Sequence, residues 1–255
     1  MVKFHIGCSG FYYNHWKPDF YPEDLPKSKW FQYYCEHYNT LELNVTFYRF
    51  PKITTFENWY KKTPRNFRFA VKAPRLITHF KQFKDTSAMM QGYYDIMLKG
   101  LKEKLGTVLF QLPPRSAYKP ERLERILETM DNRFNNVLEF RHPTWWNEEV
   151  YRILAKNKIS FCGMSHPDLP QEVIQNSPII YYRLHGVPEL YKSPYTPKQL
   201  KKIISEIVDH PKTRQAYIYF NNDIGGSAVK NASAMIRYLQ TINGKAKKKG
   251  ARLPG

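Results

Sequence analysis

Charged side chains recur at every second position in several short apolar runs of the chain. Glu42 lies in one such run, Glu139 and Arg141 end another, and Arg183 and His185 end a third. Carboxylates and a histidine can transfer protons, and arginines can hold an anionic group. Because burying charge is costly, its repetition on one face of buried segments indicates a functional site.

Eight strand-like segments are spaced along the chain, and side chains two apart in a strand share one face. Segments with helical periodicity lie between most of them, and Thr196–Gln199 forms a capping box with proline at the first helical position. The crossover after Ser165 has the weakest helical pattern. The predicted strands begin near Lys3, Thr40, Phe67, Thr107, Asn136, Ile159, Ile179 and Gln215.

Strands that alternate with helices predict an α/β fold with a parallel sheet and right-handed crossovers. The central strands of an open doubly wound sheet are covered on both faces and are apolar throughout. Here one face of many strands is polar, which the interior of a closed barrel permits. We therefore predict an eight-stranded (β/α)8 TIM-type barrel.

The 255 residues suit a single barrel domain, which we expect over residues 1–240, followed by a basic, disordered tail over residues 241–255. No apolar stretch is long enough to cross a bilayer, so we expect no membrane partner. The three cysteines form no CxxC pair, which argues against a disulfide framework or a structural zinc site. A reducing cytoplasm is the expected location.

The net charge of +18 is unevenly distributed. The segment Lys61–Lys84 contains eight basic residues and no acidic one, and Phe67, Phe69, Phe80 and Phe83 are interleaved with them. This pattern suits a polyanion such as nucleic acid, although a solvated surface can have the same composition.

Eight blocks of sequence stand out in order from residue 6 to about residue 240. The blocks are Ile6–Trp16, Glu42–Arg49, Phe69–Lys72, Thr78–His79, Leu109–Pro114, Glu139–His142, Arg183–Gly186 and Tyr219–Asp223. Together they resemble the YecE-like proteins, catalogued as domain of unknown function 72, although Cys8 stands where threonine is more usual in that family. The resemblance implies a TIM-type barrel and no settled biochemical role.

In a (β/α)8 barrel the chemistry lies at the C-terminal ends of the strands. We expect four acid–base residues there, namely Glu42, Glu139, His185 and Asp223. The residues expected to bind the substrate are Asn44, Lys72, Gln111, Arg141, His142, Arg183, Asn221, Asn222, Gly225, Gly226 and Ser227. A purely structural network of ion pairs is the alternative, although apolar residues would stabilise a barrel more simply.

Two further features lie near the strand ends. The turn Gly225–Ser227 leads into the last predicted helix, where glycine N–H groups and a helix N-terminus can hold phosphate, although an ordinary loop can have this sequence. Aromatic residues can stack on a base or sugar, or pack over the helices. They are Phe11, Tyr12, Trp16, Phe47, Tyr48, Trp145 and Trp146.

Three other chemistries stay open. Lys72 could form a Schiff base if a dry pocket lowers its pKa. Glu42 and Glu139 could be a glycosidase pair. A divalent metal could be held as in a phosphoesterase, although no common metal-binding histidine spacing is present. Its ligands would be Glu42, Glu139, His185 and Asp223.

We predict an enzyme that acts on a small anionic substrate, phosphorylated or derived from nucleic acid, by acid–base chemistry at the barrel mouth. Hydrolase or phosphoesterase chemistry is the candidate reaction class. The alternative is a non-catalytic nucleic-acid-binding protein that uses Lys61–Lys84. A barrel without catalysis that acts through protein partners is the third possibility.

Overall fold

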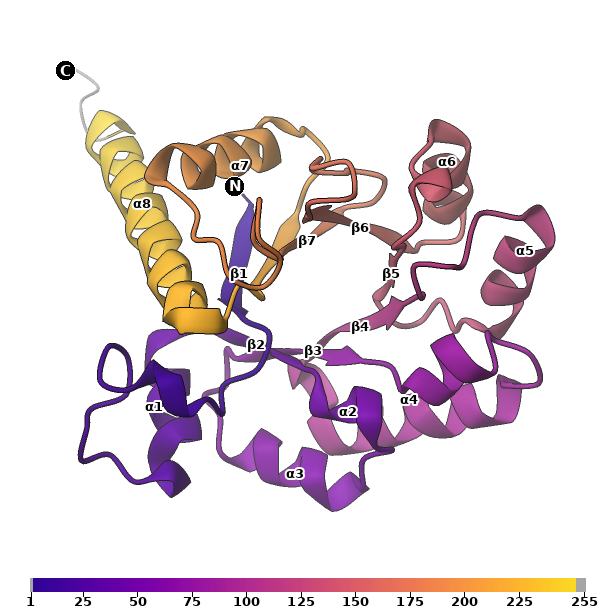
Figure 1. Cartoon of the computed structure of the whole chain (residues 1–255), viewed down its shortest axis with the longest axis horizontal. Helices are drawn as coiled ribbons and strands as arrows, with labels where there is room; N and C mark the ends of the chain where they lie inside the picture. Colours follow the sequence, from indigo (N-terminus) through magenta and orange to yellow (C-terminus); the bar gives the residue numbers. More distant parts are fainter. Residues whose placement is uncertain (1, 251–255) are drawn as a thin grey trace.

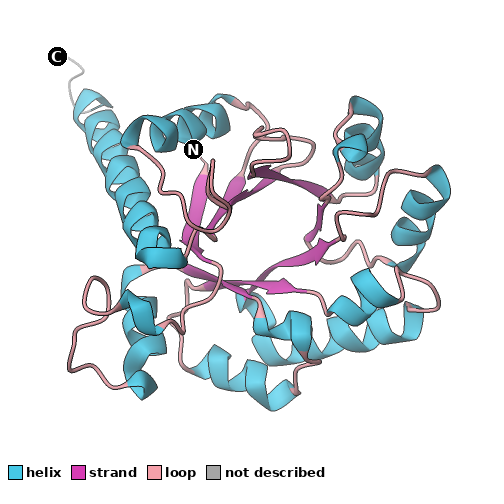
Figure 2. Ribbon diagram, in the orientation of Figure 1, coloured by secondary structure: helices cyan, strands magenta, loops and turns pink. Residues whose placement is uncertain are grey.

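The computed structural model describes residues 2–250, with side chains as far as residue 242. Eight parallel strands form a ring that helices surround (Figure 1 and Figure 2). The strands are β1 Lys3–Cys8, β2 Thr40–Leu43, β3 Arg68–Lys72, β4 Leu105–Gln111, β5 Asn136–Glu139, β6 Ser160–Ser165, β7 Ile179–Leu184 and β8 Gln215–Phe220. The predicted TIM-type barrel is confirmed, and each strand begins within two residues of its expected position.

Helices follow most of the strands. They are α1 Trp30–His37, α2 Val45–Tyr48, α3 Ile53–Lys61, α4 Ser87–Leu101, α5 Pro120–Thr129, α6 Glu148–Lys156, α7 Pro197–Asp209 and α8 Ser227–Gly250. The described segment between β6 and β7 contains no helix, as its weak helical pattern indicates. None of the described helices is both long and apolar enough to span a membrane. A cytoplasmic location stays a prediction.

The C-terminal helix differs from the sequence-based boundary. The backbone of α8 continues past residue 240, where the predicted domain ends, because alanine and lysine in this segment favour a helix. Residues 251–255 of the predicted tail lie outside the described residues.

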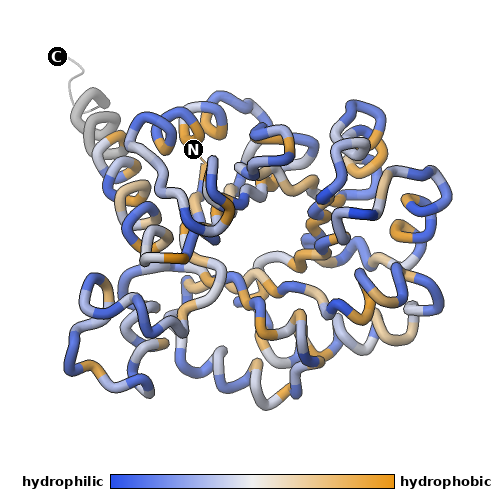
Figure 3. The backbone as a smooth tube through the Cα atoms, viewed as in Figure 1, coloured by the Kyte–Doolittle hydropathy of each residue, from blue (hydrophilic) through white to orange (hydrophobic). Residues whose placement is uncertain are grey.

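Helix α7 shows how the sequence packs the surrounding helices against the barrel. Its capping box is present, with the Thr196 side chain accepting from the Gln199 N–H. Leu200, Ile204 and Ile207 lie on one face and are buried. The alternation of apolar and polar residues along α7 and α8 is visible in Figure 3. Such a stripe packs against the sheet and leaves the opposite face in water.

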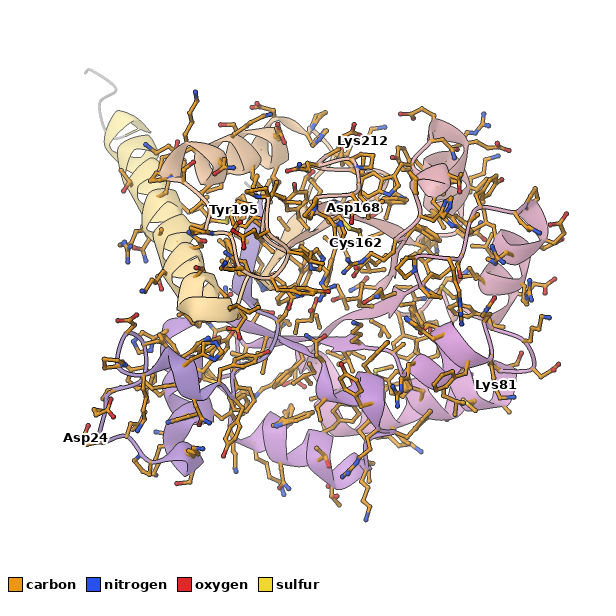
Figure 4. The ribbon with its side chains drawn as sticks, in the orientation of Figure 1. Asp24, Lys81, Cys162, Asp168, Tyr195 and Lys212 are labelled. Atoms are coloured by element: carbon orange, nitrogen blue, oxygen red, sulfur yellow. The ribbon has the colours of Figure 1, made fainter. Side chains whose placement is uncertain are left out.

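The barrel interior is a separate apolar cluster. All but one of its side chains come from alternate positions of the strands, as a period of two requires, and Leu169 comes from the segment after β6. Cys162, for example, is fully buried and lies inside the ring of strands (Figure 4). The cluster consists of Ala70, Leu109, Val137, Cys162, Met164, Leu169, Tyr181, Tyr217 and Tyr219. Apolar and aromatic groups thus fill the middle of the barrel, and the charged groups lie at its C-terminal end.

The barrel closes between β1 and β2 largely through side chains. One backbone bridge joins Ser9 and Glu42. Nearer the middle, the Tyr34 hydroxyl accepts from the Cys8 N–H at 2.8 Å and donates to the Thr40 carbonyl at 3.0 Å. Gly7 makes room for this contact, because a Cβ there would lie 2.3 Å from the Thr40 oxygen. The two strands are therefore joined by a buried hydroxyl.

Removing the Tyr34 hydroxyl should weaken the contact between β1 and β2. We expect Tyr34→Phe to lower the free energy of unfolding by about 2–3 kcal/mol. The substitution leaves the buried Cys8 N–H and the buried Thr40 carbonyl without a hydrogen-bond partner. Urea denaturation measures the change. The matched control is Tyr33→Phe on the same helix, a half-buried tyrosine whose hydroxyl does not bridge the strands. Equal losses of unfolding free energy in the two variants would contradict the role of the Tyr34 hydroxyl in joining β1 and β2.

Candidate functional site

Arg183 of β7 joins two carboxylates across the C-terminal end of the barrel. Its Nη2 donates to Glu42 Oε1 of β2 at 2.6 Å, and its Nη1 donates to Glu139 Oε2 just inside the end of β5 at 2.7 Å. The three side chains are 1%, 0% and 0% exposed. Burial opposes the charge of Arg183, but the two carboxylates outweigh it and raise its pKa well above its usual value. The ion pairs therefore link three strands.

Glu42 also accepts two hydrogen bonds from uncharged donors. Ser9 Oγ donates to Glu42 Oε1 at 2.6 Å, and the Tyr181 hydroxyl donates to Oε2 at 2.6 Å. These hydrogen bonds and the ion pair with Arg183 fix the position of the buried Glu42 side chain. Glu42 is thus a fixed counter-ion in this structure.

Glu139 has a similar environment. Its Oε1 accepts from Arg141 Nε, and its Oε2 accepts from Arg183. Burial acts to raise the pKa of Glu139, but the charges of Arg141, Arg183 and Lys72 outweigh burial and lower the pKa to about 2. Glu139 is therefore ionised at neutral pH and has no proton to donate.

His185 lies directly beside this network and is fully buried. Arg141 Nη2 lies 3.1 Å from its Nε2, and the Asn221 side-chain amide lies 3.0 Å from its Nδ1. Since a guanidinium can only donate, Nε2 accepts and the ring proton is on Nδ1. The atom beside Nδ1 is the Asn221 Nδ2, itself a donor, so a hydrogen bond from Nδ1–H requires the Asn221 carboxamide to turn its Oδ1 toward the ring. Burial and then the charges of Arg141 and Arg183 lower the pKa of His185 well below its usual value. The imidazole is neutral at pH 7.

Lys72 of β3 is the cation of this group without a carboxylate partner. Its Nζ donates to Gln111 Oε1 at 2.6 Å and lies 4.2 Å from the centre of the Phe47 ring. Among the described residues it forms no ion pair, although it is only 8% exposed. Burial, followed by the charge of Arg183, lowers its pKa to about 8. The mouth therefore holds one positive charge that the protein leaves unmatched.

Asp223 lies apart from the other three predicted acid–base residues. Its Oδ1 accepts from Trp16 Nε1 at 2.6 Å, and His15 Nε2 lies 2.9 Å from its Oδ2. Burial raises the pKa of Asp223. The carboxylate thus joins the loop after β1 to the loop after β8, whereas Glu139 and His185 face one another across the mouth.

Two predicted binding residues make other local contacts, and a third, Asn44, has a buried Oδ1 without a hydrogen-bond partner among the described residues. Asn222 is buried and donates to the Ser193 carbonyl and to Asn231. His142 caps the short turn that follows β5. Asn44 immediately precedes α2 and is half-buried. Each of them lies beyond the last residue of its strand, where a period of two no longer determines which way a side chain points.

The glycine turn before α8 is a 3-10 turn. Gly225 and Gly226 have φ angles of +79° and +72°, which glycine adopts without strain. The Gly226 N–H donates to the Asp223 carbonyl at 2.8 Å, and Ser227 begins the helix. Backbone geometry accounts for the glycines, and a role in holding phosphate stays a prediction.

The aromatic residues near the strand ends divide by exposure. Trp16 and Trp145 are buried, whereas Tyr12 and Tyr48 are 58% and 69% exposed. The remaining three, Phe11, Phe47 and Trp146, are half-buried.

Two residues of the site escape the sequence analysis. Tyr181 precedes Arg183 by two positions on β7, so the same period of two identifies it. His166 directly follows β6, and its ring lies 5.7 Å from that of His185. Both are buried.

The arrangement bears on the other chemistries. Arg183 lies between Glu42 and Glu139 and occupies an oxygen of each, in the place where a glycosidic bond would have to enter. In the described part of the chain, no three His, Cys, Asp or Glu side chains are grouped so that they could hold a metal ion.

Removing the charge of Arg183 should lower the stability of the fold. We expect Arg183→Met to lower the free energy of unfolding by about 3–5 kcal/mol, because two buried carboxylates lose their shared partner. The control is Lys202→Met, which removes an exposed ion pair with Glu206 and should cost less than about 1 kcal/mol. Similar changes in urea denaturation for both variants would contradict the described network.

The neutral state of His185 can be observed directly. We expect the 15N resonances of its ring to stay those of the neutral Nδ1–H tautomer between about pH 5 and 8, because its pKa is lowered well below the usual value. An exposed histidine titrates within this range. NMR of the labelled protein makes the measurement, and titration of His185 with a midpoint near 6.5 would refute the assignment.

Comparison with known proteins agrees with this architecture. UPF0759 protein YunF of Bacillus subtilis is 26% identical over 259 residues, which cover 86% of this chain and 89% of that protein. UPF0759 protein YecE of Escherichia coli O157:H7 is 28% identical over 157 residues, covering 60% of this chain and 54% of that protein.

Solved structures give the same result. A DUF72 family protein from Thermotoga maritima superposes with a TM-score of 0.84 at 29% identity, covering 93% of this chain and 99% of the other. A DUF72 family protein from Enterococcus faecalis, 17% identical with a TM-score of 0.80, shares the fold. The family model described as "Protein of unknown function DUF72" matches residues 5–253. The chain therefore belongs to the DUF72 family.

Proposed function

We propose that the barrel mouth binds a small anionic substrate and transfers a proton to or from it. The observation that carries this proposal is the unmatched charge of Lys72. The carboxylates of Glu42 and Glu139 are balanced by Arg183 and Arg141, and the neutral His185 adds no charge. A buried cation without a carboxylate partner is costly, and an anionic ligand would relieve that cost.

Arg141 supplies a second donor to the substrate. Its Nε binds Glu139 and its Nη2 faces His185, while Nη1 has no hydrogen-bond partner among the described residues. A guanidinium can engage two oxygens of a carboxylate or phosphate at once. Lys72 and Arg141 would therefore hold a phosphorylated or nucleic-acid-derived compound, with Arg183 remaining bound to its two carboxylates.

His185 is the residue best placed to move a proton. The lone pair of its neutral ring is on Nε2, which accepts from Arg141 Nη2, so an anion that draws the Arg141 guanidinium toward itself would free Nε2 to accept a proton. The oxygens of both glutamates already accept hydrogen bonds from the arginines, which suits these side chains to positioning Arg141 and Arg183. We infer acid–base chemistry of the hydrolase or phosphoesterase type, with His185 as the base and Glu42 and Glu139 as positioning residues.

A nucleic-acid-binding role for Lys61–Lys84 is the second candidate. Its basic residues lie on both sides of β3, with Lys61 before the strand and Arg75 after it. Figure 4 shows Lys81 near the outer edge of the molecule, away from the barrel interior. Of the interleaved phenylalanines only Phe80 is exposed. What supports this candidate is the net charge of +18.

Removing the unmatched cation tests the first candidate. With inorganic phosphate as the probe in isothermal titration calorimetry, we expect Lys72→Met to weaken binding at least about tenfold, the loss of one charge-assisted hydrogen bond. Lys84→Met, an exposed lysine of the same segment, is the control and should bind as the natural protein does. Equal binding by all three proteins, or no phosphate binding by any, would refute the mouth site. Binding of an oligonucleotide that depends equally on Lys84 and Lys61 would favour the second candidate.

The affinity for phosphate should also depend on pH. Because the Lys72 amine binds an anion only while protonated and its pKa is lowered to about 8, affinity should fall as the pH rises past that value. The Lys72→Met variant should lose this dependence. Calorimetry in buffers from about pH 7 to 10 makes the comparison, and an unchanged affinity across that range would contradict a role for Lys72.

A further inference from the structure

Resting on the proposed anion site, we infer that its substrate is a 5′-nucleotide, whose base lies on a platform formed by Tyr48, Arg75 and Phe80. The platform belongs to the segments that follow β2 and β3, on the rim of the barrel mouth. It is made of three planar groups, two aromatic rings and one guanidinium.

The platform is open to solvent. Tyr48 is 69% and Phe80 65% exposed, so neither ring is used to pack the core. The Arg75 guanidinium lies 5.6 Å from the centre of the Tyr48 ring and 5.4 Å from that of Phe80. Arg75 forms no ion pair within the described part of the chain. Exposed aromatic rings grouped around a free cation are typical of a binding surface.

The platform is continuous with the anion site through Phe47. One side of this contact is Lys72 Nζ, 4.2 Å from the centre of the Phe47 ring. The other side is Tyr48, whose ring centre lies 5.2 Å from that of Phe47 at an interplanar angle of 90°. Phe47 thus separates the buried cation from the exposed rings by the width of one aromatic side chain.

The backbone that presents Phe80 is unusual. Leu76–Phe80 form a π-helical turn, a geometry that is rare and concentrated at functional sites. Just beyond it Gln82, Phe83 and Asp85 have φ angles of +47°, +63° and +50°. Non-glycine residues in this region are strained and persist only where the surrounding structure holds them. Buried Phe83 anchors the segment, so its exposed members have a fixed position.

The anion site and the adjacent platform together specify the class of ligand. An anion site alone accepts any small phosphate, but an adjacent planar, cationic surface adds a preference for a flat ring on the same molecule. Bases stack on aromatic rings and on guanidinium groups, with about 1–3 kcal/mol per base. A nucleoside 5′-phosphate has its anion and its planar base on opposite sides of one sugar. It is the compound class that engages both features.

The test compares AMP with ribose 5-phosphate, which lacks the base, by calorimetry. We expect the natural protein to bind AMP about tenfold more tightly. The double variant Tyr48→Ala, Phe80→Ala should bind AMP as weakly as ribose 5-phosphate, with the affinity for ribose 5-phosphate unchanged. The control is Tyr12→Ala, which removes another exposed aromatic residue, from the loop that follows β1. This variant should preserve the preference for AMP.

The outcomes separate this inference from the proposed function. Equal affinity for AMP and ribose 5-phosphate, both lost in Lys72→Met, would overturn the base platform and leave the anion site standing. A preference for AMP that survives the double variant would also overturn the platform. Binding of neither compound would overturn both. A single-stranded oligonucleotide that binds far more tightly than AMP, with strong salt dependence, would replace the nucleotide with a polymer.

Discussion

One arginine bound by two buried carboxylates determines the character of the barrel mouth. The Glu42–Arg183–Glu139 bridge joins β2, β7 and β5 where no backbone ladder connects them directly. Because it is buried, breaking it would leave charges far from water, so the three strand ends are held in one relative position. The field of its arginine, together with that of Arg141, contributes to the neutral state of His185 and to the lowered pKa of Lys72.

The bridge also divides the polar residues by task. The groups that it occupies are unavailable to a ligand, since each oxygen of Glu42 and Glu139 already accepts a hydrogen bond. Lys72 and Arg141 lie next to it with N–H groups that can still bind a ligand. A structural network and a binding site are therefore parts of the same cluster, in which the first positions the second. The rim residues after β2 and β3 extend this site into solvent.

The architecture can be predicted well from the sequence, because the positions of strands and helices depend on local patterns. Strand ends, helix caps and a period of two are readable along the chain, and they place Glu42, Glu139 and Arg183 inside the barrel. The pairing of Arg183 with two carboxylates depends on how strands far apart in the sequence are staggered around the ring, which no local pattern encodes. The pattern also ends with each strand, so Asn222 and Asp223 point to partners in neighbouring loops.

We expect the barrel mouth to bind an anion at Lys72 while Arg183 stays bound to Glu42 and Glu139. A crystal structure of the protein soaked in phosphate tests it most directly. We predict a phosphate whose oxygens lie within hydrogen-bonding distance of Lys72 Nζ and Arg141, with both ion pairs of Arg183 unchanged. A phosphate bound to Arg183 in place of a carboxylate, or bound only outside the mouth, would contradict it.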